Sequence, residues 1–143
     1  MKNGSKRLIL RGFLTLVVII KVMNCSARQT GKDNIEGIWK GTSLCQVKSS
    51  PCHDENVVYH ISRATNGKTY TIQMNKIVNG AEEEMGAADA VYDETKHTLT
   101  STTKNRQGRI GVWLFKIDDK QMHGTLTIDE KTLYRIIEMR KTD

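Results

Sequence analysis

The pentapeptide Gly37-Ile38-Trp39-Lys40-Gly41 decides the fold class of this chain. It places a tryptophan between two nearby glycines, after a polar stretch and before a long run of short segments in which apolar and polar residues alternate. Alternation with a period of two is typical of β-strands, because successive side chains of a strand point to opposite faces. The pentapeptide therefore predicts the first strand of a closed β-structure.

Further strands are predicted downstream, separated by runs of turn-forming residues, with no segment suited to a crossover helix. The Asn66-Gly67 and Asn79-Gly80 pairs supply the positive φ angles that a tight hairpin needs. Even spacing of this kind predicts an antiparallel meander, and closing it into a barrel removes the exposed edges. The fold class is thus all-β, an up-and-down barrel of about eight antiparallel strands. The predicted strands span residues 37–47, 56–62, 69–78, 82–92, 97–103, 109–117, 121–128 and 132–139.

The strand predicted at 82–92 is the least regular. Its Met85-Gly86-Ala87-Ala88 stretch also fits a helical turn, although a strand with a bulge or bend at Gly86 is favoured. The glutamates at 82–84 suit a solvated strand end, and a calcium site there would need oxygen ligands from elsewhere. In the 109–117 strand both faces are apolar, which predicts cover on both sides near Leu114.

The charge distribution argues against a nucleic-acid-binding protein. Five of the 22 basic side chains lie before Ala27, which leaves 17 basic against 16 acidic side chains in the rest of the chain. These basic residues are interspersed with acids and form no stripe that would follow a phosphate backbone. At 143 residues, with 38% apolar and 27% charged residues, the chain has room for one globular domain.

The N-terminal segment has the organisation of an export signal. Basic residues at positions 2, 6 and 7 precede an apolar stretch at 8–20, whose uninterrupted part is well short of the ~20 residues of a transmembrane anchor. Small residues at Cys25 and Ala27 predict a signal peptide at 1–27, followed by a flexible lead at 28–36. The alternative is a lipoprotein signal ending before Cys25, whose lipid would be the only link to a membrane.

Removal of the signal leaves two cysteines, Cys45 and Cys52, which an oxidising compartment would pair. Residues of turn-forming composition separate them, so the disulfide would staple the first hairpin near its tip, with a stabilisation at or below the usual ~2–4 kcal/mol. A metal site at Cys45, Cys52 and His53 is the alternative, although no second close ligand pair accompanies it. Together with the signal, the cysteines predict a protein that is periplasmic, secreted or anchored to the outer membrane.

Residues 37–140 resemble the lipocalin-like, or calycin, barrels, in particular the short secreted lipocalin-like proteins of Gram-negative bacteria. Gly37-Ile38-Trp39 matches the Gly-x-Trp motif on the first strand of that family. The late arginine of the family, which packs across this tryptophan, would correspond to Arg135, with Arg140 as second choice. The resemblance thus implies a Trp39–Arg135 cation–π clamp that joins the first strand to the last. The chain departs from full lipocalins in being short, in lacking their C-terminal helix and in having its disulfide within the first hairpin.

No motif in the sequence points to catalysis. The histidines at 53, 60, 97 and 123 are scattered singly, and neither a nucleophile elbow nor a phosphate-binding glycine loop is present. The densest polar cluster, His53-Asp54-Glu55, suits a charged turn at a hairpin tip. We therefore expect no enzyme, no catalytic residues, no metal and no cofactor.

Two functions fit this architecture. The resemblance implies a carrier whose barrel holds a small apolar or amphipathic ligand. The alternative is a cell-envelope protein-binding module or inhibitor that uses its loops and the Cys45–Cys52 hairpin, with the barrel interior filled by side chains. The side chains expected inside the barrel, which would bind the ligand of a carrier, are Tyr59, Ile61, Tyr70, Ile72, Met74, Trp113, Phe115 and Leu126.

Overall fold

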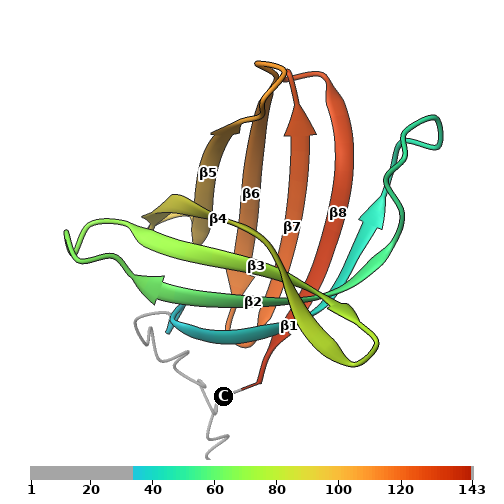
Figure 1. Cartoon of the computed structure of the whole chain (residues 1–143). Coiled ribbons are helices and arrows are strands. Elements are labelled where there is room, and N and C mark those ends of the chain that lie inside the picture. The colour runs from blue at the N-terminus through green and yellow to red at the C-terminus, as the bar shows by residue number, and fades with distance from the viewer. Residues whose placement is uncertain (1–33, 143) are drawn as a thin grey trace, which may run out of the picture. The chain divides into compact units, whose positions relative to one another are not determined.

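Eight antiparallel strands form a closed barrel in the computed structural model, which describes residues 34–142 (Figure 1). Each strand pairs with the next along the chain, and β8 returns to pair with β1. The predicted up-and-down barrel is confirmed, and each predicted strand is present to within two residues at either end. The strands are β1 (Gly37–Cys45), β2 (Glu55–Arg63), β3 (Tyr70–Val78), β4 (Ala81–Asp93), β5 (Thr98–Lys104), β6 (Ile110–Asp118), β7 (Gln121–Ile128) and β8 (Thr132–Lys141).

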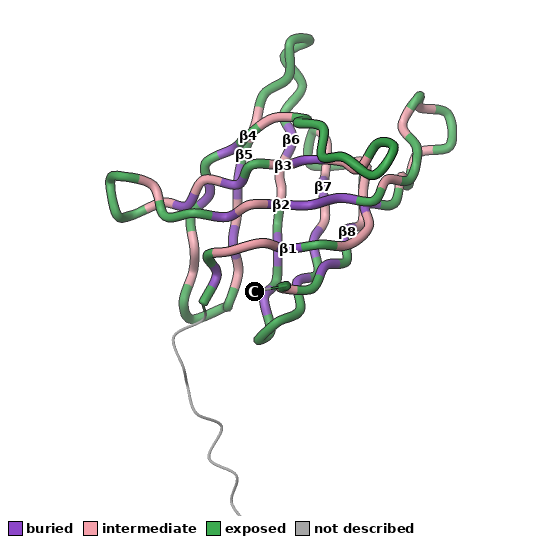
Figure 2. Tube along the Cα trace, turned by 60° about the horizontal axis from the view of Figure 1, so that its bottom comes forward, coloured by how far each residue is buried: buried purple, intermediate pink, exposed green. Residues whose placement is uncertain are grey.

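Buried and more exposed residues alternate along much of the strands, as expected where successive side chains point to the barrel interior and to the outer surface (Figure 2). The inward side chains form one core, in which Trp39, Leu99, Phe115 and Ile137 each have 0% exposure. The outer face is different from the prediction at Leu114, which was expected to be covered on both sides and is 44% exposed. The reason is that no element of the described residues packs on the outside of β6.

The end of the barrel that carries Trp39, which we call the tryptophan end, is closed by packed side chains. The Trp39 Nε1–H donates to the Ile35 carbonyl oxygen at 2.9 Å, and both residues lie in the core. The Arg63 guanidinium lies 4.8 Å from the centre of the Tyr70 ring and donates to the Tyr70 hydroxyl. Ile35, which the sequence placed in the lead segment, therefore packs as part of the barrel.

The predicted clamp between Trp39 and Arg135 is not formed. In the register of β1 and β8, Trp39 lies opposite Lys141, and Arg135 lies opposite Cys45 at the other end of β1. Arg140, the second choice, is exposed on the outer surface. Because the two strands run in opposite directions, an arginine in the first half of β8 meets the last half of β1, far from the tryptophan.

Turn chemistry explains the two Asn-Gly hairpins, which differ from each other. Asn79 and Gly80 have φ angles of 50° and 82°, as predicted for a tight hairpin. At the β2–β3 hairpin only Gly67 has a positive φ, of 69°, so the prediction for Asn66 is wrong. That loop is longer, and Asn66 Oδ1 instead accepts the amide protons of the two residues after Gly67.

β4 carries the predicted bulge and pairs least with the strand that follows it. Gly86, with a φ of 145°, lies opposite Met74 and Glu84 lies opposite Asn75, which leaves Met85 without a counterpart on β3. β4 and β5 share three residue pairs, whereas the other neighbouring strands share seven to nine. The seam between β4 and β5 is therefore unpaired over most of the length of β4.

The export signal predicted at 1–27, the lipidation alternative at Cys25 and the first part of the 28–36 lead lie outside the described residues. Within the described residues, no helix is long and apolar enough to cross a membrane.

Candidate ligand-binding site

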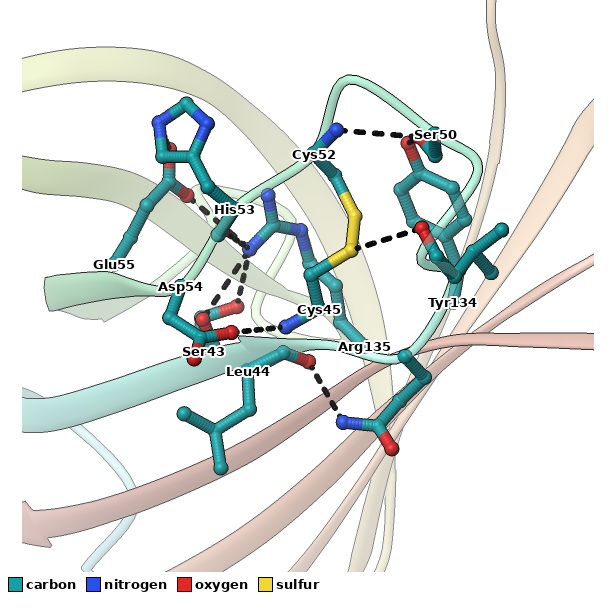
Figure 3. A network of polar contacts seen from close by, with 12 residues as sticks. Ser43, Leu44, Cys45, Ser50, Cys52, His53, Asp54, Glu55, Tyr134 and Arg135 are labelled. Carbon is teal, nitrogen blue, oxygen red and sulfur yellow. Dashed lines mark hydrogen bonds and ion pairs between the residues drawn. A yellow bond between two sulfur atoms is a disulfide. The ribbon is translucent and has the colours of Figure 1, made fainter.

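Arg135 reaches the barrel interior at the end opposite the tryptophan end, which we call the disulfide end. The pairing of β6, β7 and β8 places it in one cross-strand row with Leu126 and Trp113. Only 14% of the Arg135 side chain is exposed. Its Nη1 donates to the backbone oxygens of Ser43 and His53, each at 3.3 Å, and to Ser43 Oγ at 3.1 Å (Figure 3). The guanidinium is thus anchored by β1 and by the loop that precedes β2.

Glu55 balances the charge of Arg135. It is the first residue of β2, its side chain is 13% exposed, and its Oε2 lies 3.3 Å from Arg135 Nη1. Taking two charges out of water is costly, and their attraction offsets the cost only when further hydrogen bonds satisfy the charged groups. The carbonyl of His53 and the hydroxyl of Ser43 accept such bonds. The result is a site with no net charge that holds hydrogen-bond donors and acceptors side by side.

Tyr59 brings to this site a hydroxyl that is not hydrogen-bonded. The residue is 1% exposed, and its hydroxyl oxygen has no hydrogen-bond partner among the described residues. Burial raises the pKa of the Tyr59 hydroxyl above its usual range, the charge of Arg135 partly opposes this shift, and Glu55 adds to it. The hydroxyl therefore interacts electrostatically with both Arg135 and Glu55, and it stays protonated at neutral pH. A buried polar group without a partner costs about 1–3 kcal/mol.

The loop at 46–54 positions the backbone oxygen that the guanidinium uses. The predicted Cys45–Cys52 disulfide closes this loop, with 5.9 Å between the two Cα atoms. The Cys45 amide donates to Asp54 Oδ1 at 2.8 Å, and the hydroxyls of Ser50 and Tyr134 lie 2.6 Å apart (Figure 3). These contacts hold the loop against β1 and β8. A disulfide at this place suggests an oxidising, extracytoplasmic location.

The side chains predicted to line the interior all lie in the core or against it, but at different levels of the barrel. Ile61 and Tyr70 lie toward the tryptophan end, where Ile61 pairs with Gly37 and Tyr70 pairs with Arg63. Ile72, Phe115 and Tyr59 have 1% exposure or less, so they are shielded from solvent within the core. Trp113 and Leu126 lie in the cross-strand row of Arg135, nearer the disulfide end, and Met74 lies opposite Tyr59 in the middle of β3.

Aromatic rings form the floor of the disulfide end. The Trp113 ring stacks on Phe115 with 5.9 Å between centroids, and Phe115 meets the Tyr59 ring edge-on at 6.1 Å. Gly124 makes this arrangement possible, because a Cβ atom there would lie 2.4 Å from the Phe115 ring. Trp113 and Met74 are only partly buried, so part of their apolar surface is not covered by the core.

Two residues of the site, Ser43 and Glu55, were not predicted. Ser43 shares the inward face of β1 with Trp39, and Glu55 precedes Val57 and Tyr59 by steps of two on the inward face of β2. The period of two was therefore the signal that could have found both. It was missed for Glu55 because the second strand was predicted to begin one residue later.

A second hollow lies on the outer surface. A groove of about 580 Å³ crosses β1, β6, β7 and β8, and its walls include Lys40, Lys116, Asp118 and Glu138. In this groove His123 Nδ1 lies 2.5 Å from Glu138 Oε1. Side chains of both charges line the groove, with Arg140 as a third basic residue.

The metal alternative at Cys45, Cys52 and His53 is overturned, because the two sulfur atoms are bonded to each other. Across residues 34–142 no group of three or more His, Cys, Asp or Glu side chains is placed to hold a metal ion. Another histidine, His60, lies on the outer surface, where its Nε2 is 2.7 Å from Glu82 Oε2.

The fold defines this chain as an eight-stranded antiparallel β-barrel, an architecture compatible with binding. No protein-family model matches the chain, and no curated protein is found to be similar to it in sequence. The likeness to lipocalin-like proteins accordingly rests on the barrel and on the Gly-x-Trp motif of β1.

Proposed function

We propose that this protein is an exported, non-enzymatic binding protein that takes one small amphipathic molecule into the disulfide end of its barrel. The polar group of the ligand lies against Arg135, Glu55 and the Tyr59 hydroxyl, and its apolar part lies against Trp113 and Met74. The observation that carries this proposal is the Tyr59 hydroxyl, which is buried beside an ion pair and has no partner among the described residues.

The energetics of the site support a ligand at this place. A buried hydroxyl without a partner costs about 1–3 kcal/mol, and a ligand that hydrogen-bonds to it recovers part of that cost. The aromatic surface of Trp113 then supplies apolar contact area for the rest of the molecule. An eight-stranded barrel can hold one small ligand besides its own side chains, which is compatible with a site confined to one end.

The charge of the site restricts the polar group. Arg135 is already neutralised by Glu55, so an anionic group has to compete with that carboxylate for the guanidinium. A neutral group that both donates and accepts hydrogen bonds, such as a hydroxyl or a primary amide, competes with neither charge. We therefore expect fatty alcohols and amides to bind more tightly than fatty acids of the same length.

No reaction is part of this proposal. The Tyr59 hydroxyl has a raised pKa, which makes it a poor base or nucleophile at neutral pH. The contacts of Arg135 with Ser43, His53 and Glu55 give it a positioning role.

The proposal includes export, on the strength of the N-terminal signal pattern and the disulfide. The mature protein is then periplasmic, secreted or anchored to the outer membrane, the last through a lipid on Cys25. Intact mass of the exported protein distinguishes cleavage after Ala27 from lipidation.

The test is a titration with decanol, decanamide and decanoate, followed by tryptophan fluorescence and by the NMR signal of the Met74 methyl group. Trp39 is fully buried and Trp113 is only partly buried, so the fluorescence change is expected mainly from Trp113. Micromolar binding of the neutral probes is expected. Tyr59→Phe removes one hydrogen bond of about 1 kcal/mol and should therefore weaken the binding of the neutral probes about fivefold.

The matched control is Tyr70→Phe, which removes a hydroxyl at the tryptophan end and should leave the affinity unchanged. If neither Trp113 nor Met74 responds to millimolar decanol, the carrier is excluded. The protein-binding module that uses its loops and the Cys45–Cys52 hairpin is then the better account.

A further inference from the structure

We propose that the open edge of β4 binds an extended, basic segment of another protein by strand addition. This surface is separate from the ligand site inside the barrel, so either proposal can fail without the other. The occupant is a peptide in which lysine or arginine alternates with apolar residues.

The edge exists because β4 leaves β5 after a short contact. Val91, Tyr92 and Asp93 are the residues of β4 that pair with β5, and the pairing stops at Val91. Between Ala81 and Ala90, every residue except Met85 pairs with β3 on one side, and within the described part of the chain none pairs with a strand on the other side. Unpaired strand edges present backbone donors and acceptors that can pair with another chain.

The bulge explains why β4 diverges. An extra residue on one strand bends it and increases its twist. Met85 is that residue, and the φ of 145° at Gly86 is readily available only to glycine. The bend occurs before β4 reaches β5, so the first part of the strand follows β3 instead.

A side chain shows which backbone groups point into the open seam. The Ser101 hydroxyl of β5 donates to the Asp89 carbonyl oxygen at 2.6 Å, so this carbonyl faces β5 and has lost its backbone partner there. Residues two apart in a strand point their backbone groups the same way. Ala87 therefore directs its N–H and C=O into the same seam, where an added strand would pair with them.

The charge of β4 determines the kind of partner. The strand carries five acidic side chains and no basic one. Three of the acidic side chains lie in the exposed run at 82–84, where Glu82 pairs with His60 and Glu83 pairs with Lys76. A second copy of this chain paired antiparallel along the same edge would bring these glutamates together, and like charges across a strand pair repel. A basic strand would instead be attracted to this edge, because opposite charges across neighbouring strands stabilise their pairing.

The inward face of the seam explains why apolar residues should alternate with the basic residues of the bound peptide. β4 places small residues there, namely Gly86, Ala88 and Ala90, and β5 adds Ser101. An added strand would therefore place apolar side chains next to these small residues on its inward face, while its outward face meets Glu84. Lysine and valine in alternation satisfy both faces.

The experiment uses a fluorescein-labelled octapeptide of alternating lysine and valine, with a glutamate–valine peptide as its control. Fluorescence anisotropy should show that the lysine peptide binds, that its binding weakens with added salt, and that the glutamate peptide does not bind. In ¹⁵N NMR spectra the amides of Ala87 and Asp89 should shift on binding. Tyr59→Phe, which alters the ligand site, should leave the peptide affinity unchanged.

Two substitutions with the same change in charge separate the edge from general electrostatics. Glu84→Lys should weaken peptide binding about fivefold at low salt, since it converts a cross-strand attraction into repulsion. Asp118→Lys, at the tryptophan end of β6, should change the affinity less than twofold. Ala87→Pro removes an edge N–H and should also weaken binding; if this variant does not fold, the Glu84→Lys comparison still decides.

Three results would overturn the proposal. The first is an equal effect of Glu84→Lys and Asp118→Lys, which means that any acidic surface suffices. The second is peptide-induced shifts that bypass Ala87 and Asp89. The third is a dimer of the protein alone in which these two amides become protected from exchange, which would make a second copy the occupant.

Discussion

Arg135 and Glu55 are opposite charges in a site with little water, so each depends on the other. Arg135→Met should lower the free energy of unfolding by about 3 kcal/mol, because it leaves a carboxylate buried without its partner. Adding Glu55→Leu removes that carboxylate and should restore most of the loss. Urea unfolding of both variants measures this. Arg140→Met, on the exposed outer surface, is the control and should lie within about 0.5 kcal/mol of the parent.

The Tyr59 hydroxyl gives stability a dependence on alkaline pH. Its folded-state pKa is raised above the unfolded value of about 10, so its contribution is complete below that pH and is lost as the pH rises above it. The test compares the urea midpoints of the parent and of Tyr59→Phe from pH 8 to 11. At the alkaline end the midpoint of the parent should fall relative to that of the variant. Near neutral pH the variant should be equal to the parent or about 1 kcal/mol more stable, since an unpaired hydroxyl is gone. A loss at neutral pH would show that the hydroxyl has a partner in solution.

At the scale of elements, the disulfide holds the 46–54 loop on which the Arg135 site depends. Reduction should cost about 2 kcal/mol by the chain-entropy estimate for so short a loop. It should also free the His53 carbonyl from Arg135, so ligand binding should weaken along with stability. Intact mass after thiol alkylation, with and without reductant, establishes the state of Cys45 and Cys52. Two free thiols in exported protein would contradict the disulfide.

The seam between β1 and β8 closes the barrel and depends on a residue without a side chain. A Cβ atom at Gly41 would lie 1.9 Å from the Glu138 carbonyl oxygen, which is backbone of the facing strand. Gly41→Ala should therefore separate the two strands and prevent a stable barrel, seen as loss of cooperative thermal unfolding. Gly80→Ala is a useful comparison, because nothing lies near its Cβ position and only its φ of 82° is strained. A folded Gly41→Ala protein with parent stability would exclude this account of the seam.

At the scale of the whole molecule, the barrel should open first between β4 and β5. Three residue pairs hold this seam, against seven at the closing seam of β1 and β8. Local opening follows the regions with the fewest backbone hydrogen bonds. Hydrogen exchange should accordingly be fastest, among the strands, along β4 before Val91 and along the last residues of β5. Slower exchange there than in β1 would mean that the seam is covered in solution.

The sequence by itself determined the features that depend on neighbours along the chain. The number and approximate bounds of the strands follow from the period of two, the hairpin at Asn79-Gly80 from the backbone freedom of that pair, and the bulge at Gly86 from its lack of a side chain. The Cys45–Cys52 disulfide also belongs here, because its two cysteines lie seven positions apart. Inward and outward faces follow from the same alternation, which is why the predicted interior residues are found in the core or against it.

Only the tertiary structure decided what depends on register between strands distant in sequence. The pairing of β1 with β8 moved Arg135 from the predicted clamp on Trp39 to Ser43 and Glu55, and so created the candidate site. The early end of the β4–β5 pairing is equally invisible in the sequence, which shows where strands begin but not where they separate. The physical reason is the same in both cases: closing a barrel aligns every strand at once, and a shift in one register changes which side chains meet across the whole interior.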